Sequence, residues 1–152
     1  MVIMSENSYS TLLSFKLQDE FFAIDAMRVN HILEVPEITK VPNTPAFMVG
    51  VLNLHGNIIP VVDLRLMMGF ENTALTNDSA VVVINPEDQH DSSLGVIVDM
   101  VKEVVETEGL EIKPTVADKE ESMLRNFHGT FSIEDQFVHI IDIEELVVAA
   151  EV

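Results

Sequence analysis

The 152-residue sequence predicts a mainly β protein made of two small five-stranded barrels that arose by internal duplication. Roughly ten short apolar segments are separated by turns, a spacing typical of barrels rather than of βαβ units. Two phrases recur along the chain: residues 57–66 resemble 136–145, and residues 22–29 resemble 96–103. Two copies are too few for a solenoid, so we expect a pair of similar β units packed together.

Composition limits the kinds of function that the chain can have. Apolar residues make up 47% of the sequence, which is enough for a packed core. The absence of Cys excludes a disulfide scaffold, a thiolate metal site and a cysteine nucleophile. The N-terminus lacks the basic and apolar regions of a signal peptide, and apolar runs of about five residues are too short to span a membrane. We therefore expect a cytoplasmic protein without direct membrane insertion.

The chain is strongly acidic, with a formal net charge of −18. Such a surface repels the phosphates of nucleic acids and anionic lipid, so we expect no nucleic-acid partner. The acidic residues occur in small clusters, which are typical of solvated faces. We therefore interpret the acidity as a property of the exposed surface.

The first third of the chain contains short extended segments broken by turns and prolines. In order, we expect a flexible segment over 1–9, a half-buried strand around 13–17, a strand over 21–24, one helical turn capped by Asp25, an extended segment over 29–35 and a surface loop over 36–46.

The segment 51–66 predicts a β-hairpin followed by a short helix. The His-Gly-Asn sequence at 55–57 tolerates positive φ and indicates a tight turn between two apolar strands. Asp63 ends the second strand and can cap a helix over 64–68, which Gly69 ends.

The second half begins after a polar segment at 71–79, the best internal boundary in the sequence. In order, we expect a buried strand over 80–84, a wet loop over 85–93, strands over 94–98 and 101–105, a helix opened by Asp118 and Glu121 with Met123, Leu124 and Phe127 on one face, a hairpin over 131–141 and a C-terminal helix over 144–150.

A series of motifs in this order resembles the CheW-like chemotaxis coupling proteins. Each motif is weak alone, but their common order is specific, and they cover roughly residues 10–148 as one domain. The motifs are Phe-Ala-Ile-Asp at 22–25, Val-Asn-His-Ile at 29–32, Thr-Lys-Val-Pro-Asn-Thr-Pro-Ala-Phe at 39–47, Gly-Val-Leu-Asn-Leu-His-Gly at 50–56, Ile-Pro-Val-Val-Asp-Leu-Arg at 59–65, Gly-Val-Ile-Val-Asp-Met-Val-Lys-Glu-Val at 95–104, Ile-Lys-Pro at 112–114 and Ile-Ile-Asp-Ile-Glu-Glu-Leu at 140–146.

The resemblance implies a non-catalytic adaptor made of two intertwined five-stranded SH3-like barrels, with a few short helices and a C-terminal helix. It places the first barrel mostly in the N-terminal half and the second mostly in residues 80–146, with strands able to exchange between them. Proteins of this family couple the cytoplasmic tip of transmembrane chemoreceptors to the regulatory domain of a histidine kinase. The receptor tip lies between the barrels, and barrel ends contact the kinase. Such a protein is a monomer in isolation and is recruited to membrane receptor arrays.

Two positions depart from the family pattern. His31 stands where the family usually has Glu in Val-x-Glu-Ile, and His55 stands where it usually has Arg in Asn-Leu-Arg-Gly. Both positions lie on the receptor-facing side of the family's first barrel. We infer that the two residues face each other and changed as a pair, which alters receptor recognition. A second interpretation is a specialised regulator of twitching motility or array positioning, which binds a kinase or a localisation partner without ordinary receptor coupling.

The expected interaction site lies on two segments of the first barrel, where apolar area adjoins polar anchors. Its residues are Val29, His31, Ile32, Asn53, Leu54, His55 and Gly56. Within this set we expect Val29 to be exposed, Ile32 to belong to the core and Gly56 to serve the backbone turn.

A hydrolase is the main enzymatic alternative. Its nucleophile, base and orienting group would come from Ser132, from His128 or His139, and from Asp142. No nucleophile elbow, phosphate-binding loop or helical His pair accompanies them. We therefore expect no enzymatic activity.

The histidines leave a metal site and a pH sensor as further alternatives. Imidazole is a common metal ligand, but His31 and His55 lack an evident carboxylate partner, and Asp88, His90 and Asp91 lie in a polar loop. Protonation of both paired imidazoles in acid would place like charges together. We expect instead two neutral, hydrogen-bonded surface histidines, with no metal and no cofactor.

Overall fold

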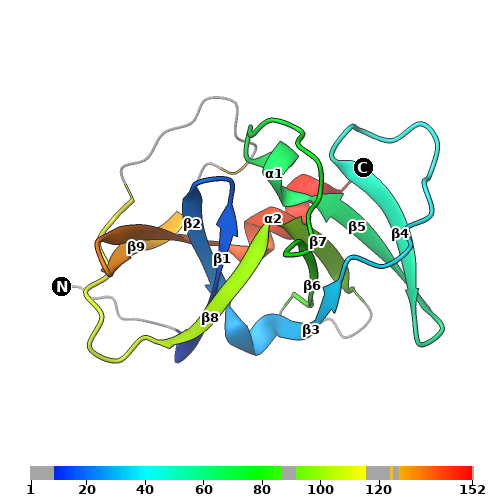
Figure 1. Ribbon diagram of the computed structural model, residues 1–152. Helices are drawn as coiled ribbons and strands as arrows, with labels where there is room; N and C mark the ends of the chain where they lie inside the picture. The colour runs from blue at the N-terminus through cyan, green and yellow to red at the C-terminus, as the bar shows by residue number, and fades with distance from the viewer. Residues whose placement is uncertain (1–8, 87–91, 116–123, 125–126, 152) are drawn as a thin grey trace.

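The computed structural model describes residues 9–86, 92–115, 124 and 127–151, and its strands form two five-stranded sheets (Figure 1). The elements in chain order are β1 (Thr11–Leu17), β2 (Glu20–Asp25), the 3-10 turn η1 (Ala26–Arg28), β3 (Val29–Glu34), β4 (Met48–Leu54), β5 (Asn57–Asp63), α1 (Leu64–Met67), β6 (Ala80–Ile84), β7 (Leu94–Val98), β8 (Met100–Glu106), β9 (Phe127–Ile133), β10 (Gln136–Ile141) and α2 (Ile143–Ala150). The predicted mainly β architecture, with short helices and a C-terminal helix, is confirmed.

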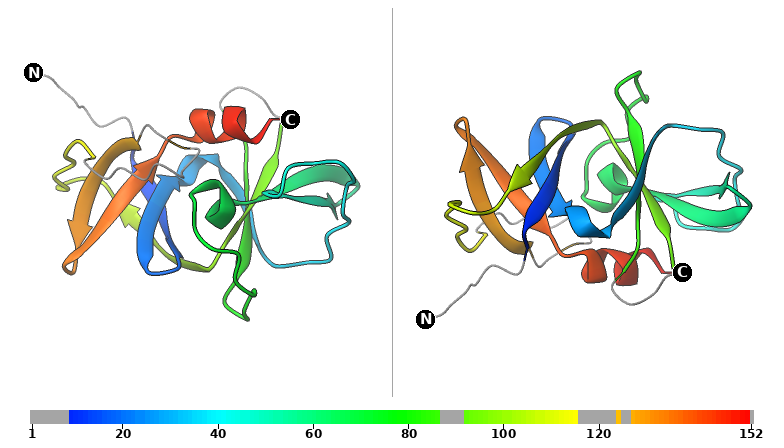
Figure 2. Two further views of the ribbon diagram at one scale, coloured as in Figure 1. Left: turned by 90° about the horizontal axis from the view of Figure 1, so that it is seen from above. Right: turned by 90° about the horizontal axis from the view of Figure 1, so that it is seen from below.

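Each sheet is an SH3-like barrel that combines strands from distant parts of the chain. The strand order is β8-β1-β2-β10-β9 in one sheet and β3-β6-β7-β5-β4 in the other. Within each sheet one pair is parallel, β10 with β2 and β5 with β7, and the remaining pairs are antiparallel. The β9–β10 and β4–β5 hairpins lie at opposite ends of the molecule (Figures 1 and 2).

Each barrel takes three strands from one half of the chain and two from the other half. β6 and β7 belong to the second half, yet they join β3, β4 and β5, while β1 and β2 complete the sheet of β8, β9 and β10. The chain crosses between sheets through η1, and it crosses back at Asp99, between β7 and β8. Strand exchange therefore occurs in both directions and ties the two barrels into one unit.

The register of the two sheets matches in a way that an internal duplication explains. β5 with α1 corresponds to β10 with α2, as the first repeated phrase predicts. β3 and β8 each contain a bulge, after Val29 and after Val101. These bulges align Val29 with Val101, whereas the second repeated phrase aligns it with Glu103. The alignment by the second repeated phrase is therefore two residues out of register with the structure. Short apolar runs match almost equally well after a shift of two residues, which is one period of strand alternation.

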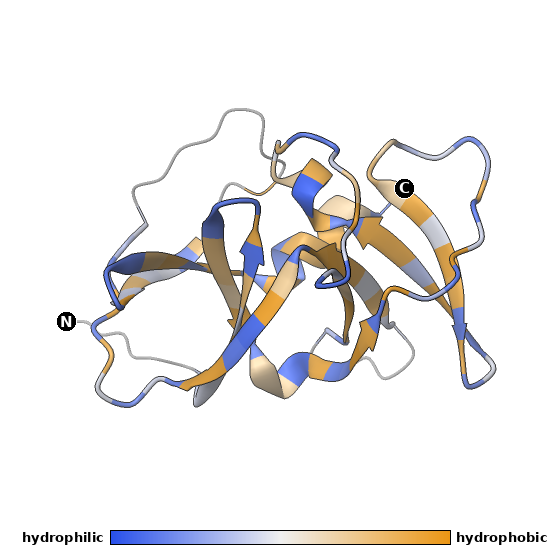
Figure 3. Cartoon of the chain, in the orientation of Figure 1, coloured by the Kyte–Doolittle hydropathy of each residue, from blue (hydrophilic) through white to orange (hydrophobic). Residues whose placement is uncertain are grey.

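Apolar side chains form one cluster inside each barrel and a larger cluster between the barrels. Because side chains alternate between the two faces of β6, this one strand contributes to two of the three clusters. Val81 and Val83 belong to the interior of their own barrel. Val82 and Ile84 belong to the central cluster, which also contains residues of β1, β2, α1 and α2. Both faces of β6 are therefore covered, which explains its continuous apolar sequence. Figure 3 shows hydrophobic segments on the strands where the two barrels meet.

Some sequence predictions concern residues that the structure does not describe. They are most of the N-terminal segment 1–9, residues 87–91 of the predicted loop, and the start of the helix at Asp118 and Glu121. Phe127, which was expected on that helix, begins β9 instead. Among the described residues, no helix has the length and apolar character needed to cross a membrane.

Candidate interaction surface

The β4–β5 hairpin presents His55 at its tip. His55 and Gly56 have φ values of 54° and 87°, the left-handed pair that a two-residue hairpin turn with the twist of its strands requires. The Gly56 N–H donates a hydrogen bond to Asn53 Oδ1 over 2.9 Å. Asn53 and Gly56 therefore fix the turn, as expected for Gly56, and the exposed His55 side chain is held on a defined backbone.

The edge strand β3 supplies the other half of the surface, and it corrects two predictions. Val29 is half-buried and packs against the central cluster, whereas Ile32 is 48% exposed. The bulge leaves Asn30 without a partner on β6, since Val29 pairs with Ile84 and His31 pairs with Val83. An extra residue shifts the alternation of the pleat, so Val29 and Ile32, which pair with Ile84 and Val82, lie on the same face of β3 instead of on opposite faces. Val29 is covered by the central cluster, and Ile32 lies exposed on that face.

His31 on β3 and His55 on the hairpin lie side by side, as inferred from their paired departure. Their ring centroids are 6.1 Å apart, with an angle of 47° between the ring planes. They border a hollow of about 360 Å³, which we call the His31–His55 hollow. Its lining residues are Asn30, His31, Leu54, His55, Asn57, Ile58, Ile59, Val83, Asn85 and Ser93. Among the described residues, this lining contains no Asp, Glu, Lys or Arg, although the chain as a whole carries a charge of −18.

The structure thus brings three of the seven predicted site residues into one hollow: His31, Leu54 and His55. Neither imidazole makes a hydrogen bond or an ion pair with another described residue. The hydrogen bonds expected for these surface histidines are therefore not made to other described residues. The arrangement offers apolar contact and unpaired imidazole nitrogens on an uncharged surface, which suits the docking of a partner.

The residues considered for a hydrolase are not assembled as a nucleophile, base and orienter. His139 Nδ1 lies 2.8 Å from Thr130 Oγ1, and no contact of the described residues joins this ring to Ser132. His128 Nε2 lies 3.2 Å from Asp142 Oδ2, at the start of α2. Asp142 itself accepts a hydrogen bond from the first turn of that helix, so its role is that of a cap.

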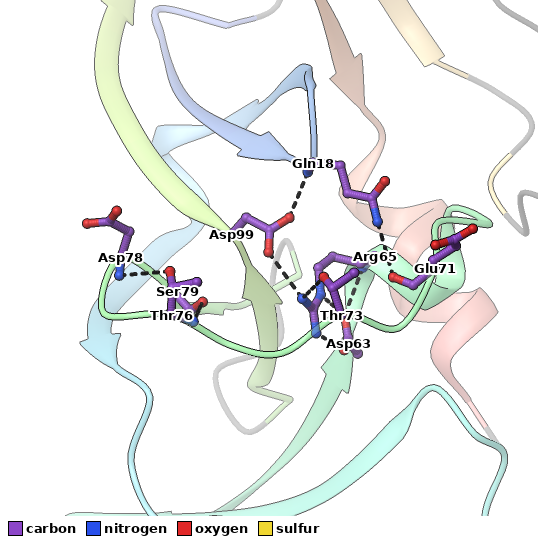
Figure 4. A network of polar contacts seen from close by, with 9 residues as sticks. All are labelled: Gln18, Asp63, Arg65, Glu71, Thr73, Thr76, Asp78, Ser79 and Asp99. Atoms are coloured by element: carbon purple, nitrogen blue, oxygen red, sulfur yellow. Dashed lines mark hydrogen bonds and ion pairs between the residues drawn. The ribbon is translucent and has the colours of Figure 1, made fainter.

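Sequence reasoning missed a buried ion-pair network centred on Arg65 (Figure 4). Arg65 is only 2% exposed. Its Nε donates to Asp63 Oδ1 over 2.9 Å and its Nη2 to Asp63 Oδ2 over 2.8 Å, while its Nη1 donates to Asp99 Oδ1 over 3.1 Å and to Thr73 Oγ1 over 3.2 Å. The hydrogen bond with Asp63, together with the nearby carboxylate charges, raises the pKa of Arg65 above its usual range despite burial.

The same network joins the two sheets. Asp63 ends β5, and Asp99 is the residue at which the chain crosses back from one sheet to the other. The other oxygen of Asp99, Oδ2, accepts a 2.7 Å hydrogen bond from the Gln18 N–H at the β1–β2 turn. A single buried guanidinium therefore connects a strand end of one barrel to a turn of the other.

Exposed apolar side chains occupy corresponding places at the two ends of the molecule. Ile58 on β5 is 63% exposed, and Phe137 on β10 is 69% exposed. Each is the second residue of its strand and follows a tight hairpin turn. Large exposed apolar side chains on rigid strands are typical of contact surfaces, so both barrel ends have the composition of an interface.

Two strand-exchanged barrels with exposed apolar side chains at both ends are an architecture that suits a scaffold protein. The chain belongs to the CheW-like family: the model described as CheW-like domain matches residues 11–151. It is 28% identical to the chemotaxis protein CheW of Klebsiella aerogenes over 91% of this chain and 82% of that protein. It is 29% identical to CheW of Helicobacter pylori over 88% of this chain and 79% of that protein.

The crystal structure of the scaffolding protein TtCheW from Thermoanaerobacter tengcongensis has the same fold. It superposes with a TM-score of 0.72 at 29% identity, covering 88% of this chain and 89% of that chain. The structural match and the sequence matches each cover most of the chain. The chain is therefore a CheW-family scaffold of the chemotaxis system rather than an enzyme.

Proposed function

We propose that this protein couples chemoreceptors to a histidine kinase, with the His31–His55 hollow forming part of the receptor-docking face. The observation that carries the proposal is the hollow itself, which combines unpaired imidazoles with the apolar side chains of Leu54 and Ile58. The exposed Ile32 extends apolar area along β3 beside it. In the family, the positions of His31 and His55 face the receptor, which supports the same assignment here.

We further propose that the two barrel ends contact the regulatory domains of histidine kinases. Ile58 and Phe137 are exposed at corresponding places on hairpins at opposite ends of the molecule. A rigid scaffold with two separated contact surfaces can link successive partners, and many weak contacts then act together in an assembly. Recruitment to membrane receptor arrays would follow from these contacts.

The test is a pair of NMR titrations of the full chain. The partners are the regulatory domain of a chemotaxis-type kinase and a receptor-tip fragment, both from the same genome. We expect the receptor tip to shift signals of His31, Ile32 and Leu54, and the kinase domain to shift signals of Phe137. Ile58 borders the hollow as well as the barrel end, so its signal does not distinguish the two partners. Ile32→Asp should weaken receptor binding alone, and Phe137→Asp should weaken kinase binding alone.

Val148→Asp provides the matched control, because Val148 is an exposed apolar residue on α2. It should leave both affinities unchanged. Kinase binding without receptor binding would favour the specialised regulator instead of the coupling role. Absence of both interactions would contradict the proposed function altogether.

The two histidines supply a test of receptor choice. His55→Arg restores the residue that the family usually has, so it should raise the affinity for ordinary family receptor tips. Isothermal calorimetry with such a tip would measure the change. Equal or weaker binding would argue that His55 does not set specificity.

A further inference from the structure

His31 and His55 differ from the other described histidines in what surrounds their rings. The ring of His139 is hydrogen-bonded to Thr130, and the ring of His128 contacts Asp142. His31 and His55 contact each other, and neither makes a polar contact with another described residue. Two imidazoles whose nitrogens are uncommitted, held beside each other, are the elements of a metal site.

The two rings lie close enough to come onto one shared ion. Because a metal–nitrogen bond is about 2.0–2.1 Å long, tetrahedral coordination of one ion by two imidazoles brings their ring centroids to about 5 Å. The observed separation is 6.1 Å, so side-chain rotation that closes the rings by about 1 Å completes the pair of ligands. His31 is held by the pairing of β3 with β6, and His55 by the turn that Asn53 and Gly56 stabilise. The two ligands are therefore positioned by backbone structure rather than by each other.

The surroundings also favour a cation. The lining residues that the structure describes include no Lys or Arg that would repel a metal ion. The chain carries a net charge of −18, and such a field raises the local concentration of cations. Imidazole nitrogen prefers Zn²⁺, Cu²⁺ and Ni²⁺, whereas Mg²⁺ and Ca²⁺ prefer oxygen ligands. The donor set therefore selects the first group.

We propose that His31 and His55 together bind one divalent transition-metal ion, with Zn²⁺ as the probe ion. Within the described residues, no group of three or more His, Asp or Glu side chains surrounds a common site. The protein thus supplies two ligands, and the remaining positions are left to water or to a docked partner. Sites of this open kind keep coordination positions available for exchange.

An ion in this position would place positive charge in an otherwise uncharged docking hollow. This consequence rests on the proposed function. A carboxylate of a docked receptor tip could then complete the coordination, so zinc should strengthen receptor binding by the wild-type chain. The metal would thereby replace the acid and base that the family usually has at these two positions.

The primary experiment uses the full chain alone. Calorimetry with ZnCl₂, together with NMR of the histidine rings, should show one ion per chain and simultaneous shifts of His31 and His55. His31→Gln and His55→Gln should each weaken this binding by at least about tenfold, since losing a ligand costs more than losing a supporting contact. His128→Gln is the control, and it should leave zinc affinity unchanged. MgCl₂ at the same concentrations should not shift either ring.

Three results would overturn the proposal. The first is separate titration of each histidine with zinc, so that removal of one leaves the affinity at the other unchanged. The second is wild-type zinc binding by both single variants, which would place the ions on the acidic surface. The third is a zinc titration that shifts neither ring. Because no partner is present in these titrations, their outcome is independent of the receptor and kinase tests.

Discussion

Replacement of Arg65 by Met should destabilise the protein strongly. Met has a similar length and fits an apolar site, so the change removes the charge and the hydrogen bonds with little loss of volume. It leaves Asp63 without its partner, and the Asp63 side chain is only 6% exposed. It also removes one partner of Asp99, whose side chain is 22% exposed.

The magnitude follows from burial. Breaking a buried ion pair by removing one partner costs about 3–5 kcal/mol, because the remaining charge stays desolvated. Asp99 is partly exposed and recovers some hydration, so we expect the lower part of this range, about 3–4 kcal/mol. For a chain of this size, a loss of about 3–4 kcal/mol lowers the melting temperature by roughly 6–16 °C.

Urea unfolding at pH 7, followed by circular dichroism, would measure the effect. Arg65→Lys is the comparison for Arg65→Met, because it keeps the charge and loses the planar fork; it should be destabilised less. In the Arg65→Met background, Asp99→Asn should restore part of the stability, since it removes an unpaired charge. A loss below about 1 kcal/mol for Arg65→Met would refute the view that a buried ion-pair network holds the barrels together.

Two further predictions concern a glycine and a histidine. Gly50→Ala should lower the free energy of unfolding in urea by more than about 1 kcal/mol, because φ is +153° and the new Cβ would lie 2.1 Å from the Thr39 carbonyl oxygen. Gly56→Ala is the comparison, because Gly56 also has a positive φ but faces open space. An equal loss in the two variants would show that the clash is irrelevant. Burial lowers the pKa of His139 below its ordinary 6.5, with Glu20 opposing the shift. The unfolded state therefore binds the proton more readily, and the stability of the fold falls as the pH drops below 6.5. His139→Gln should lose less stability than the wild type between pH 7 and 5.5. An unchanged pH dependence of stability in this variant would contradict the prediction.

The elements that occur in both copies of the repeat could be predicted from the sequence. The phrase shared by 57–66 and 136–145 predicted β5 and β10, and it also predicted the two aspartate caps. Asp63 accepts a 3.0 Å hydrogen bond from the Arg65 N–H, and Asp142 accepts one of the same length from the Glu144 N–H. These features are local, because strand alternation and capping depend on residues a few positions apart.

Features that depend on long-range pairing escaped prediction. The bulge after Val29 arises where β3 meets β6, and nothing in the sequence around it signals an extra residue. It places Val29 and Ile32 on the same face of β3, although one was expected to be exposed and the other to be buried. The adjacency of His31 and His55 was nevertheless predictable, because the inference used paired departures from a family pattern rather than strand alternation.

The buried ion-pair network of Arg65 could not be predicted from the internal repeat. The register of the sheets aligns Arg65 with Glu144 and Asp99 with Met27. The second copy therefore has neither the guanidinium nor the second aspartate, and Met27 is 70% exposed. The caps are common to both copies, whereas both members of the long-range ion pair occur in one copy only. The crossing at Asp99 is thus fixed by residues in which the copies differ, so similarity between the copies predicts the barrels but not the ion pair that joins them.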